Sequence, residues 1–344
     1  MAVDVTSNML KFAVIGAGHL GSIHARVLDE NPRVQLSMIC DVDKERGAAL
    51  ASKYGAQFCA DVSGLEGIDA AIVATPTAQH FAVAIRLLES GIHVLVEKPI
   101  CDTVEDARKL CEKAKECNLR LMVGHSERFN PVIVALEAHQ LKPRFIDSQR
   151  VSPFSFRSAD IGVVMDMMIH DIDIILHLTK SPVKAVHAVG VPVIGTNEDL
   201  ANARLVFENG AVANATASRV ALKTERILRM FSREMYVTLD FSKKVGRIIR
   251  RGKALEAGGL DLSSPEFQRI TNPLEFMQKD LVRIEELKIV EVEPLFAEDD
   301  AFLQSIIDEV EPPVSGEDGL RALETAQMIV DSAQASLSNV NLND

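Results

Sequence analysis

The feature that most constrains the fold is a glycine motif near the N-terminus. Residues 16–21 read Gly-Ala-Gly-His-Leu-Gly, which is the pattern G-x-G-x-x-G. The motif follows an apolar, β-branched segment at residues 11–16 and precedes a segment with helical periodicity at residues 19–30. A strand, a glycine turn and a helix in this order are typical of a dinucleotide-binding βαβ unit.

Each glycine of the motif has a separate expected role. Gly16 permits the tight turn after the strand, and Gly18 lets a pyrophosphate approach the backbone. Gly21 lets the helix pack closely against the strand. The free N–H groups and the positive dipole end of the helix then face the phosphates.

An acidic residue in register with the motif indicates which dinucleotide is bound. Asp41 follows Gly21 by 20 residues and lies at the end of the second predicted strand. A carboxylate there accepts hydrogen bonds from the ribose hydroxyls and repels a 2′-phosphate, which favours NAD over NADP. Arg46 could stack on adenine or reach a 2′-phosphate, so NADP remains the less favoured cofactor. A nucleotide-free domain of Rossmann type is the structural alternative.

The first third of the chain alternates short apolar strands with helices. Such alternation, with short connections, predicts a parallel sheet covered on both faces, as a Rossmann domain over residues 1–124. Strands are expected at residues 11–16, 34–40, 70–74, 93–96 and 119–123, and helices at 19–30, 44–54, 79–90 and 103–117.

The rhythm changes after residue 124. Consecutive strand-like segments joined by turns such as Asn209-Gly210 predict antiparallel pairing. We therefore expect an α+β domain over residues 125–344, with helices near 130–140 and 163–179 and a long loop near 254–273. Two C-terminal helices, near 296–310 and 318–339, could pack back on the first domain.

Composition excludes several classes of protein. The chain has 344 residues, 37 Lys and Arg against 49 Asp and Glu, and a net charge of −12, which disfavours binding of nucleic acid. No apolar run approaches the roughly 20 residues of a membrane helix, and the first residues do not resemble a signal peptide. Five cysteines without a C-x-x-C pair are typical of reduced thiols in a cytoplasmic protein.

Five further motifs carry a family resemblance. In order along the chain they are His24 after the glycine motif, Ala74-Thr75-Pro76 with His80, Glu97-Lys98-Pro99, Arg128-Phe129-Asn130-Pro131, and Asp166-x-x-x-His170. Together they resemble the glucose-fructose oxidoreductase / inositol dehydrogenase family over nearly the whole chain.

The resemblance implies a fold, an activity and a set of cofactor contacts. It implies a large, open, mostly antiparallel sheet in the second domain, and oxidation or reduction of a sugar, cyclitol or related alcohol with a nicotinamide cofactor. It also implies oligomers, a homodimer or homotetramer, packed through the open sheet face. The cofactor contacts are then expected from Gly16, Gly18, His19, Leu20, Gly21, Asp41, Ala74, Thr75, Pro76, His80, Glu97 and His125.

Three side chains suit the chemistry of alcohol oxidation. Lys98 follows a parallel strand at its carboxyl end, where open α/β sheets bind ligands, and a desolvated lysine can exchange a proton. His170 is an imidazole that can act as a base near neutral pH, and Asp166 shares its helix face at i and i+4. We expect His170 to take the hydroxyl proton, Lys98 to polarise the reacting oxygen and Asp166 to bind a neighbouring hydroxyl, although Lys98 and His170 could exchange roles. The structural alternatives are a surface lysine before a turn and a helical ion pair.

The same helix carries a stripe that could suggest a metal. Asp166, His170, Asp173 and His177 fall at i, i+4, i+7 and i+11. Nicotinamide chemistry needs no metal and no supporting ligand cluster occurs elsewhere in the sequence, so we predict none. Asp173 and His177 are expected to be structural.

Within the family, residues 124–131 and 166–173 look most like nucleotide-sugar 3-dehydrogenases. This likeness implies oxidation of the 3-hydroxyl of a UDP-N-acetylglucosamine-type sugar, with Arg128 and Arg157 as substrate contacts. Arginines at 144, 150 and 157 could form a local anion site for a diphosphate, or be ordinary surface charge. The alternatives are a dehydrogenase of a free sugar or inositol, an oxidoreductase that recycles a bound cofactor, and a non-catalytic NAD sensor.

Overall fold

The computed structural model describes residues 9–139, 141–155, 161–252, 272–277 and 281–338. The chain divides into two compact units. Unit one comprises residues 1–129 and 292–325, and unit two comprises residues 130–291 and 326–344. Most of the loop expected near 254–273 lies outside the described residues.

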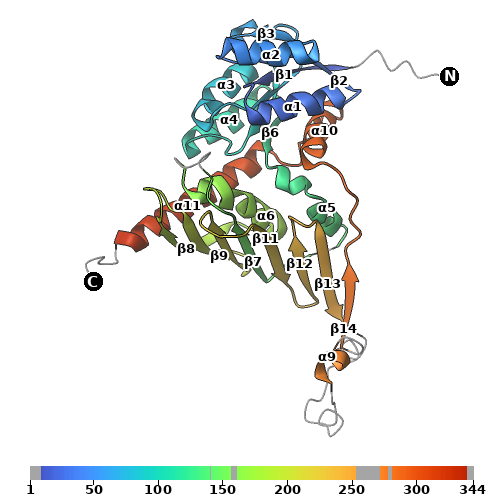
Figure 1. Ribbon diagram of the computed structural model, residues 1–344, viewed down its shortest axis with the longest axis vertical. Coiled ribbons are helices and arrows are strands. Elements are labelled where there is room, and N and C mark those ends of the chain that lie inside the picture. The colour runs from blue at the N-terminus through green and yellow to red at the C-terminus, as the bar shows by residue number, and fades with distance from the viewer. Residues whose placement is uncertain (1–8, 140, 156–160, 253–271, 278–280, 339–344) are drawn as a thin grey trace, which may run out of the picture. The chain divides into compact units, whose positions relative to one another are not determined.

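Unit one is built on a six-stranded parallel sheet with strand order β3-β2-β1-β4-β5-β6 (Figure 1). Every strand except the three-residue β3 is a short, mostly apolar run, and the four residues of β4 are all buried. The order reverses direction at β1 and β4, which is the doubly wound arrangement predicted from the alternating pattern. The strands are β1 (Leu10–Ile15), β2 (Val34–Cys40), β3 (Gln57–Cys59), β4 (Ala70–Val73), β5 (His93–Glu97) and β6 (Leu121–Gly124).

The helices of unit one begin and end at residues that the sequence marks. The Asp43 side chain accepts the N–H of Arg46 at the start of α2, and Gly55 ends that helix in the left-handed region. Contacts pair α1 with α2 and α3 with α4, as expected for the two faces of a doubly wound sheet, and α10 packs against α1. The helices are α1 (His19–Glu30), α2 (Lys44–Tyr54), α3 (Thr77–Glu89), α4 (Val104–Glu116) and α10 (Pro294–Ile307), while α11 (Gly316–Ser338) begins in unit one and ends in unit two.

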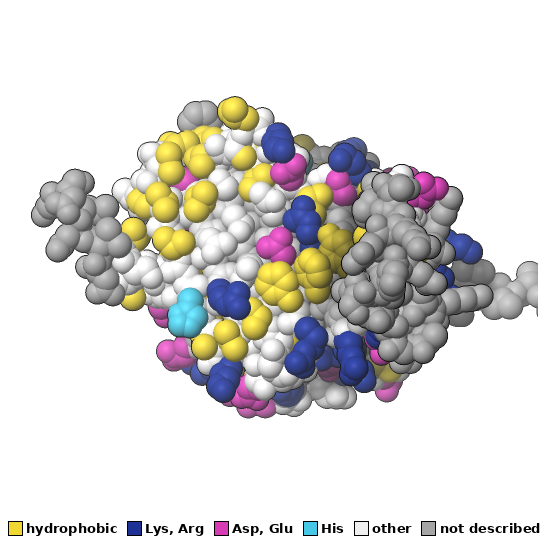
Figure 2. All heavy atoms as spheres, turned by 90° about the horizontal axis from the view of Figure 1, so that it is seen from below, with side chains coloured by type: hydrophobic (Ala, Val, Ile, Leu, Met, Phe, Trp, Pro, Cys, Tyr) yellow, Lys and Arg dark blue, Asp and Glu magenta, His cyan; other side chains and the backbone are white. Residues whose placement is uncertain are grey.

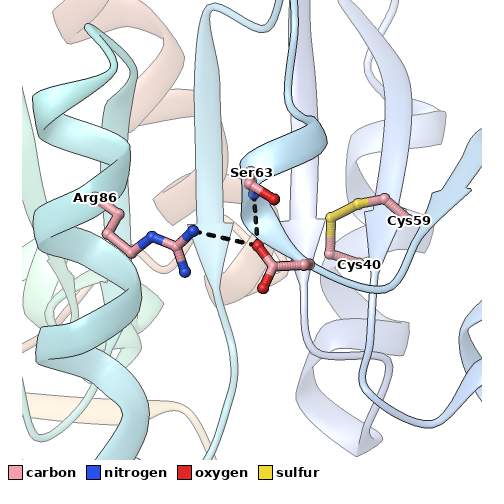
Figure 3. The surroundings of a disulfide bond; sticks show 5 residues. Cys40, Cys59, Ser63 and Arg86 are labelled. Atoms are coloured by element: carbon pink, nitrogen blue, oxygen red, sulfur yellow. Dashed lines mark hydrogen bonds and ion pairs between the residues drawn. A yellow bond between two sulfur atoms is a disulfide. The ribbon is translucent and has the colours of Figure 1, made fainter.

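The short strand β3 was not predicted, and it changes the state of two cysteines. Cys40 of β2 and Cys59 of β3 are register partners with a Cα–Cα distance of 4.8 Å, and their sulfurs form a disulfide (Figure 3). The expectation of five reduced thiols is therefore wrong for this pair, because neighbouring strands bring Cβ atoms within bonding reach. Cys101, Cys111 and Cys117 are free thiols.

Unit two contains an eight-stranded sheet with order β14-β13-β12-β11-β7-β10-β9-β8 (Figure 1). Its neighbouring strands are antiparallel except for β7 and β10, which are parallel. The turn at Asn209-Gly210 joins β9 to β10, with Gly210 at φ 79°. The strands are β7 (Phe145–Val151), β8 (Val183–Val191), β9 (Leu200–Phe207), β10 (Val212–Ser218), β11 (Glu225–Phe231), β12 (Met235–Asp240), β13 (Val245–Arg251) and β14 (Val282–Glu286).

Burial alternates along the strands of this sheet, so one face is covered and the other is not. Helix α6 (Ile169–Thr179) packs against β7 and β10, and two serines of α11 bond the backbone of Ala188 in β8. The described residues place no helix on the opposite face. Figure 2 shows hydrophobic side chains and several Lys and Arg side chains there.

The predicted helix near 130–140 is shorter in the structure, as α5 (Pro131–Glu137), capped by Asn130. A four-residue helix, α9 (Pro273–Phe276), lies next to the undescribed stretch. Over the described part of the chain, no helix combines the length and apolar character needed to cross a bilayer.

Candidate functional site

The glycine motif adopts the geometry that its sequence predicts. Gly16 has φ 100°, and a Cβ there would lie 2.6 Å from the Ala74 carbonyl oxygen, so no other residue fits without strain. A Cβ on Gly21 would lie 1.7 Å from the Gly16 carbonyl oxygen, so the start of α1 packs directly on the turn. A Cβ on Gly18 meets nothing within 4 Å. The motif thus combines two tight glycines with one that borders open space.

Asp41 is held beside the glycine turn by four hydrogen bonds. Its carboxylate accepts the backbone N–H groups of Ala17 at 2.6 Å and Asp43 at 2.8 Å. Arg46 adds its Nε at 3.2 Å and a terminal nitrogen at 2.8 Å. Burial raises the pKa of Asp41, but the hydrogen bonds from Arg46, Ala17 and Asp43 outweigh it, so the net pKa is lowered. The carboxylate is therefore an anion fixed at the end of β2.

Cys40, one of the two disulfide cysteines, directly precedes Asp41 in the chain. The Asp41 N–H donates to the Cys59 carbonyl oxygen at 3.2 Å, so β3 also pairs with the backbone of Asp41. Nearby, Asp61 accepts the N–H of Ser63 and a guanidinium N–H of Arg86, which ties the loop after β3 to α3 (Figure 3).

His80 links two of the predicted cofactor turns by backbone contacts. Its ring nitrogens lie 2.9 Å from the Thr75 carbonyl oxygen and 2.8 Å from the Pro99 carbonyl oxygen, and the side chain is buried. Burial lowers the pKa of His80, although the two carbonyls act in the opposite direction. A neutral ring then donates to only one of these carbonyls. The structure thus shows His80 bracing the Thr75 and Pro99 turns.

Glu97 belongs to a buried network that the sequence did not reveal. The His24 Nε2 lies 3.0 Å from Glu97 Oε1, and the His24 Nδ1 lies 2.9 Å from Asp299 Oδ1. All three side chains are buried, and Asp299 comes from α10, 275 residues after His24. His24 was noted only for its place after the glycine motif. The one signal for Asp299 was an acidic run, Glu298-Asp299-Asp300, inside an otherwise apolar helix.

The remaining expected contacts of unit one differ in exposure. His19 is exposed and Leu20 half-buried at the first turn of α1, and Ala74 and Thr75 are half-buried after β4 with Pro76 exposed. His125 is buried just after β6. Arg128 is buried in a short 3₁₀ turn with its guanidinium 3.8 Å from Asp318 of α11, an ion pair within unit one.

The residues expected to carry the reaction are divided between the units. Lys98 directly follows β5 in unit one and is half-buried. Asp166 and His170 lie in unit two, Asp166 in a π-helical turn (Val164–Met168) and His170 in the first turn of α6. The regular helix predicted over 163–179 therefore begins with a π turn, a feature that often occurs at functional sites.

The start of this π turn is fixed by residue Glu198 before β9. The Glu198 carboxylate accepts the Val164 N–H at 3.3 Å, and its carbonyl accepts the Val163 N–H at 2.9 Å. A Cβ on Gly162 would lie 2.1 Å from the same carboxylate, so any larger residue there would displace the Glu198 side chain from this position. The segment that carries Asp166 is thus held from outside its own helix.

The structure gives Arg150 of the expected arginine cluster a structural partner. Arg150 donates to both oxygens of Asp171 at 2.9 and 3.2 Å, and both side chains are buried. Its charge is neutralised within unit two, so Arg150 does not fit the diphosphate role suggested from sequence. Arg157 lies outside the described residues. His177 contacts Glu137 at 3.3 Å.

The NAD site passes a structural test of fit. Gly18 offers a cradle that a Cβ would fill, and the N–H groups at the start of α1 lie beside it. The Thr75 hydroxyl is a buried oxygen with no hydrogen-bond partner among the described residues. Asp41 stands at the ribose position of the pattern. These residues would hold the pyrophosphate and the adenosine ribose of a bound NAD.

Comparison with known proteins identifies the family to which both units correspond. Residues 10–125 match the family described as "Oxidoreductase family, NAD-binding Rossmann fold", and residues 133–237 match the GFO/IDH/MocA C-terminal domain. A UDP-N-acetylglucosamine 3-dehydrogenase from Acidithiobacillus ferrooxidans is 38% identical over 72% of this chain and 80% of its own length. The scyllo-inositol 2-dehydrogenase (NAD(+)) of Bacillus subtilis is 30% identical over 62% of this chain and 68% of its own.

A solved structure extends the likeness to both units. The structure of the Acidithiobacillus ferrooxidans dehydrogenase has a TM-score of 0.84 to this chain and 33% identity, and it covers 95% of this chain and 99% of its own. A mostly antiparallel C-terminal sheet and an N-terminal Rossmann sheet are common to these proteins. The chain therefore belongs to the GFO/IDH/MocA family of NAD-binding oxidoreductases.

Proposed function

We propose that the chain oxidises the 3-hydroxyl of a UDP-N-acetylglucosamine-type nucleotide sugar to a ketone. The observation that carries this proposal is the likeness to the Acidithiobacillus ferrooxidans enzyme, at 38% identity in sequence and a TM-score of 0.84 in structure. That likeness extends over 95% of this chain in structure, so it includes the unit that carries Asp166 and His170.

The reaction removes a hydride from the sugar carbon and a proton from its hydroxyl. NAD, when bound, supplies the hydride acceptor. In the proposal His170 takes the proton, Lys98 donates a hydrogen bond to the reacting oxygen, and Asp166 binds a neighbouring hydroxyl. The reverse assignment, with Lys98 as the base, predicts that Lys98→Arg loses the acidic limb of the pH–rate profile, where the rate falls as the base is protonated, while His170→Asn keeps it.

The diphosphate of such a substrate needs cationic partners. Arg157 keeps this role as a proposal. Arg128 also keeps it, although its ion pair with Asp318 gives it a structural role as well. Arg157→Ala should raise the KM for a UDP-sugar about tenfold or more, since a charge-assisted hydrogen bond contributes about 1.5–3 kcal/mol. Arg233→Ala serves as the control, since Arg233 lies between β11 and β12, outside the proposed site.

The experiment that tests the function is a substrate panel. The purified protein is incubated with NAD and, in separate reactions, UDP-N-acetylglucosamine, its uronic acid analogue, glucose or myo-inositol. The absorbance of reduced nicotinamide is followed, and a trap for the 3-ketosugar prevents the reverse reaction. Reduction by a UDP-sugar, lost in Lys98→Ala, supports the proposal. Reduction by myo-inositol alone would contradict it.

The second candidate function is oxidation of a free cyclitol. The observation in its favour is the 30% identity to scyllo-inositol 2-dehydrogenase. A free cyclitol has no diphosphate, so this function gives no ligand role to Arg128 and Arg157. The same panel separates the two functions, because a cyclitol enzyme would be unaffected by Arg157→Ala. A protein that binds NAD and reduces none of it with any substrate would instead be a sensor.

We also propose that a second copy of the chain covers the open face of the unit two sheet. On this face Phe231 stacks on Tyr236 with ring centroids 4.6 Å apart, and its ring centroid lies 5.7 Å from that of Phe145. Val189 and Val191 of β8 are 44% and 40% exposed. Phe231→Glu should convert a dimer or tetramer into smaller species in mass photometry, whereas Val134→Glu, at an exposed position of α5, should not. An unchanged oligomer would contradict this use of the face.

A further inference from the structure

A continuous line of hydrogen bonds joins α10 to the backbone of Lys98. Asp299 contacts His24 Nδ1 through both carboxylate oxygens, at 2.9 and 3.0 Å. The other ring nitrogen of His24 contacts Glu97 Oε1 at 3.0 Å. Glu97 Oε2 accepts the Lys98 N–H at 3.2 Å. The line thus runs from a carboxylate through an imidazole and a second carboxylate to a main-chain amide.

The geometry favours a positively charged ring at its centre. Both ring nitrogens of His24 face carboxylates, and only an imidazolium donates from both. Burial lowers the pKa of His24, but Asp299 and Glu97 outweigh it and raise the pKa well above its usual value. Burial likewise raises the pKa of Glu97, and His24 reverses this so that the net pKa is lowered. Near neutral pH, Glu97 is therefore an anion because His24 is a cation.

The charged groups around His24 come from two elements besides its own helix. Glu97 and Lys98 lie at the end of β5, and Glu298 and Asp299 lie on α10. Glu293, just before α10, acts on Asp299 through charge, and burial raises the pKa of Asp299. The donor atoms of His24, Glu298 and Asp299 lie within 4.8 Å of one another, a spacing that a metal ion could use. Both nitrogens of His24 are already committed to carboxylates, so we assign the cluster to hydrogen bonding.

Glu97 is held on its other side by packing. A Cβ on Gly124 would lie 3.1 Å from the Glu97 Cα and 3.1 Å from its Oε2, so Gly124 leaves room for the carboxylate and nothing more. In this position the carboxylate reaches His24 and the Lys98 amide together. Because the Lys98 N–H donates to Glu97 Oε2, the position of the carboxylate also bears on the backbone of the Lys98 turn.

We propose that His24, oriented by Asp299, is the positioning residue for the Lys98 turn, acting through Glu97. The proposal rests on the proposed role of Lys98 at the reacting oxygen. A neutral residue at 24 removes the imidazolium that hydrogen-bonds the buried Glu97 and leaves only the charge of Lys98 to favour its anion, so Glu97 takes up a proton or turns away. The Lys98 amide then loses an anionic acceptor, and the Lys98 side chain is no longer held in one place. A misplacement of about 1 Å can lower the rate by roughly 100-fold.

The test compares His24→Gln with His93→Gln. His93 is the matched control because it lies at the other end of the same strand β5, is half-buried, and accepts the Arg120 N–H through Nδ1 at 2.9 Å. For His24→Gln we expect kcat to fall about 100-fold while the KM for NAD stays within about threefold. For His93→Gln both constants should stay close to wild type. Equal kcat in the two variants, or a parallel rise of KM and fall of kcat in His24→Gln, would overturn the proposal.

A second readout does not depend on turnover. Competitive acetylation of the free protein, read by mass spectrometry, reports how the reactivity of the Lys98 amine varies with pH, with exposed Lys11 as the internal reference. His24→Gln should change the Lys98 profile and His93→Gln should not. If the wild type oxidises no sugar at all, the proposed function fails and this profile still tests the positioning role. An identical Lys98 profile in wild type and His24→Gln would refute it.

A milder variant covers the case in which His24→Gln does not fold. Asp299→Asn keeps the His24–Glu97 contact and removes one of the two anions that hold the imidazolium. It should lower kcat about tenfold and make the loss greater at high pH, because the ring loses its proton more readily. A pH–rate profile parallel to wild type would contradict the role of the charged ring.

Discussion

Replacing Gly18 by alanine should separate cofactor binding from folding. Gly18 lies at φ −71° and ψ −163°, a conformation that alanine adopts, and its added Cβ meets nothing within 4 Å. A Gly-to-Ala change at a compatible position stabilises a protein by about 0.4–1 kcal/mol through the unfolded chain. We therefore expect Gly18→Ala to be at least as stable as wild type.

The same methyl group should interfere with NAD. If the pyrophosphate approaches the backbone at Gly18, the methyl displaces it from the N–H groups at the start of α1. Loss of one hydrogen bond to a charged group costs about 1.5–3 kcal/mol, which corresponds to a rise of roughly 10- to 100-fold in the Kd for NAD.

Gly21→Ala should differ from Gly18→Ala in its effect on stability. Its Cβ would lie 1.7 Å from the Gly16 carbonyl oxygen, so α1 must move away from the turn. Overpacking of this kind costs about 1–3 kcal/mol or more, and it distorts the cofactor turn as well. Stability and NAD binding should fall together.

Calorimetric titration with NAD and thermal unfolding measure the two effects. Gly64→Ala is the control, since its Cβ has only an ordinary contact, at 3.9 Å from the Cys59 Cβ. It should bind NAD as wild type does. Gly18→Ala that binds NAD with wild-type affinity would refute the assignment of the cradle.

Three further predictions follow from buried charges and thiols. Burial raises the pKa of Cys101 and of Cys111 to about 12. Maleimide at pH 8 should therefore label only Cys117 among the three free thiols of the native protein. Rapid labelling of Cys101, detected by mass spectrometry, would contradict the burial of these thiols. Burial raises the pKa of Asp318, but Arg128 and Ser315 outweigh burial, so the net pKa in the folded protein is lowered. The ionised Asp318 therefore stabilises the fold above its unfolded pKa, and this stabilisation is lost as the pH falls through its folded pKa. Asp318→Asn should flatten the loss of unfolding free energy below about pH 4. Arg150→Ala leaves Asp171 buried without its guanidinium partner and should lower the unfolding free energy of unit two by about 3–5 kcal/mol in urea. Adding Asp171→Asn in the same chain should reduce this loss. Equal stability of the single and double variants would contradict a stabilising Arg150–Asp171 ion pair.

The local patterns of the sequence were sufficient for the parallel sheet. Apart from β3, its strands are short, mostly apolar runs, and β1, β4, β5 and β6 end at or near a glycine or proline; the glycine motif fixes the direction of the first βαβ unit. Strand β3 was missed because three residues, Gln57 to Cys59, carry no periodicity. The disulfide was missed with it, since only the register of β2 and β3 places Cys40 opposite Cys59.

The candidate site was predicted where a residue acts through its own segment. Gly16, Gly21 and Asp41 follow from strand, turn and helix rules and lie where those rules place them. The partners of His24 could not be predicted in the same way. Glu97 lies 73 residues and Asp299 lies 275 residues from His24, and no local pattern encodes such separations. Similarly, Arg150 reads as a free cation in the sequence, and only the fold shows that Asp171 neutralises it.

The proposed oxidation at one sugar carbon can be tested by isotope transfer. UDP-N-acetylglucosamine carrying deuterium at C3 is incubated with the protein and NAD, and the reduced cofactor is examined by mass spectrometry. We expect deuterium to appear in the reduced cofactor and the reaction to be slower than with unlabelled sugar. Reduced cofactor without deuterium, or no reduction of NAD by this sugar, would contradict it.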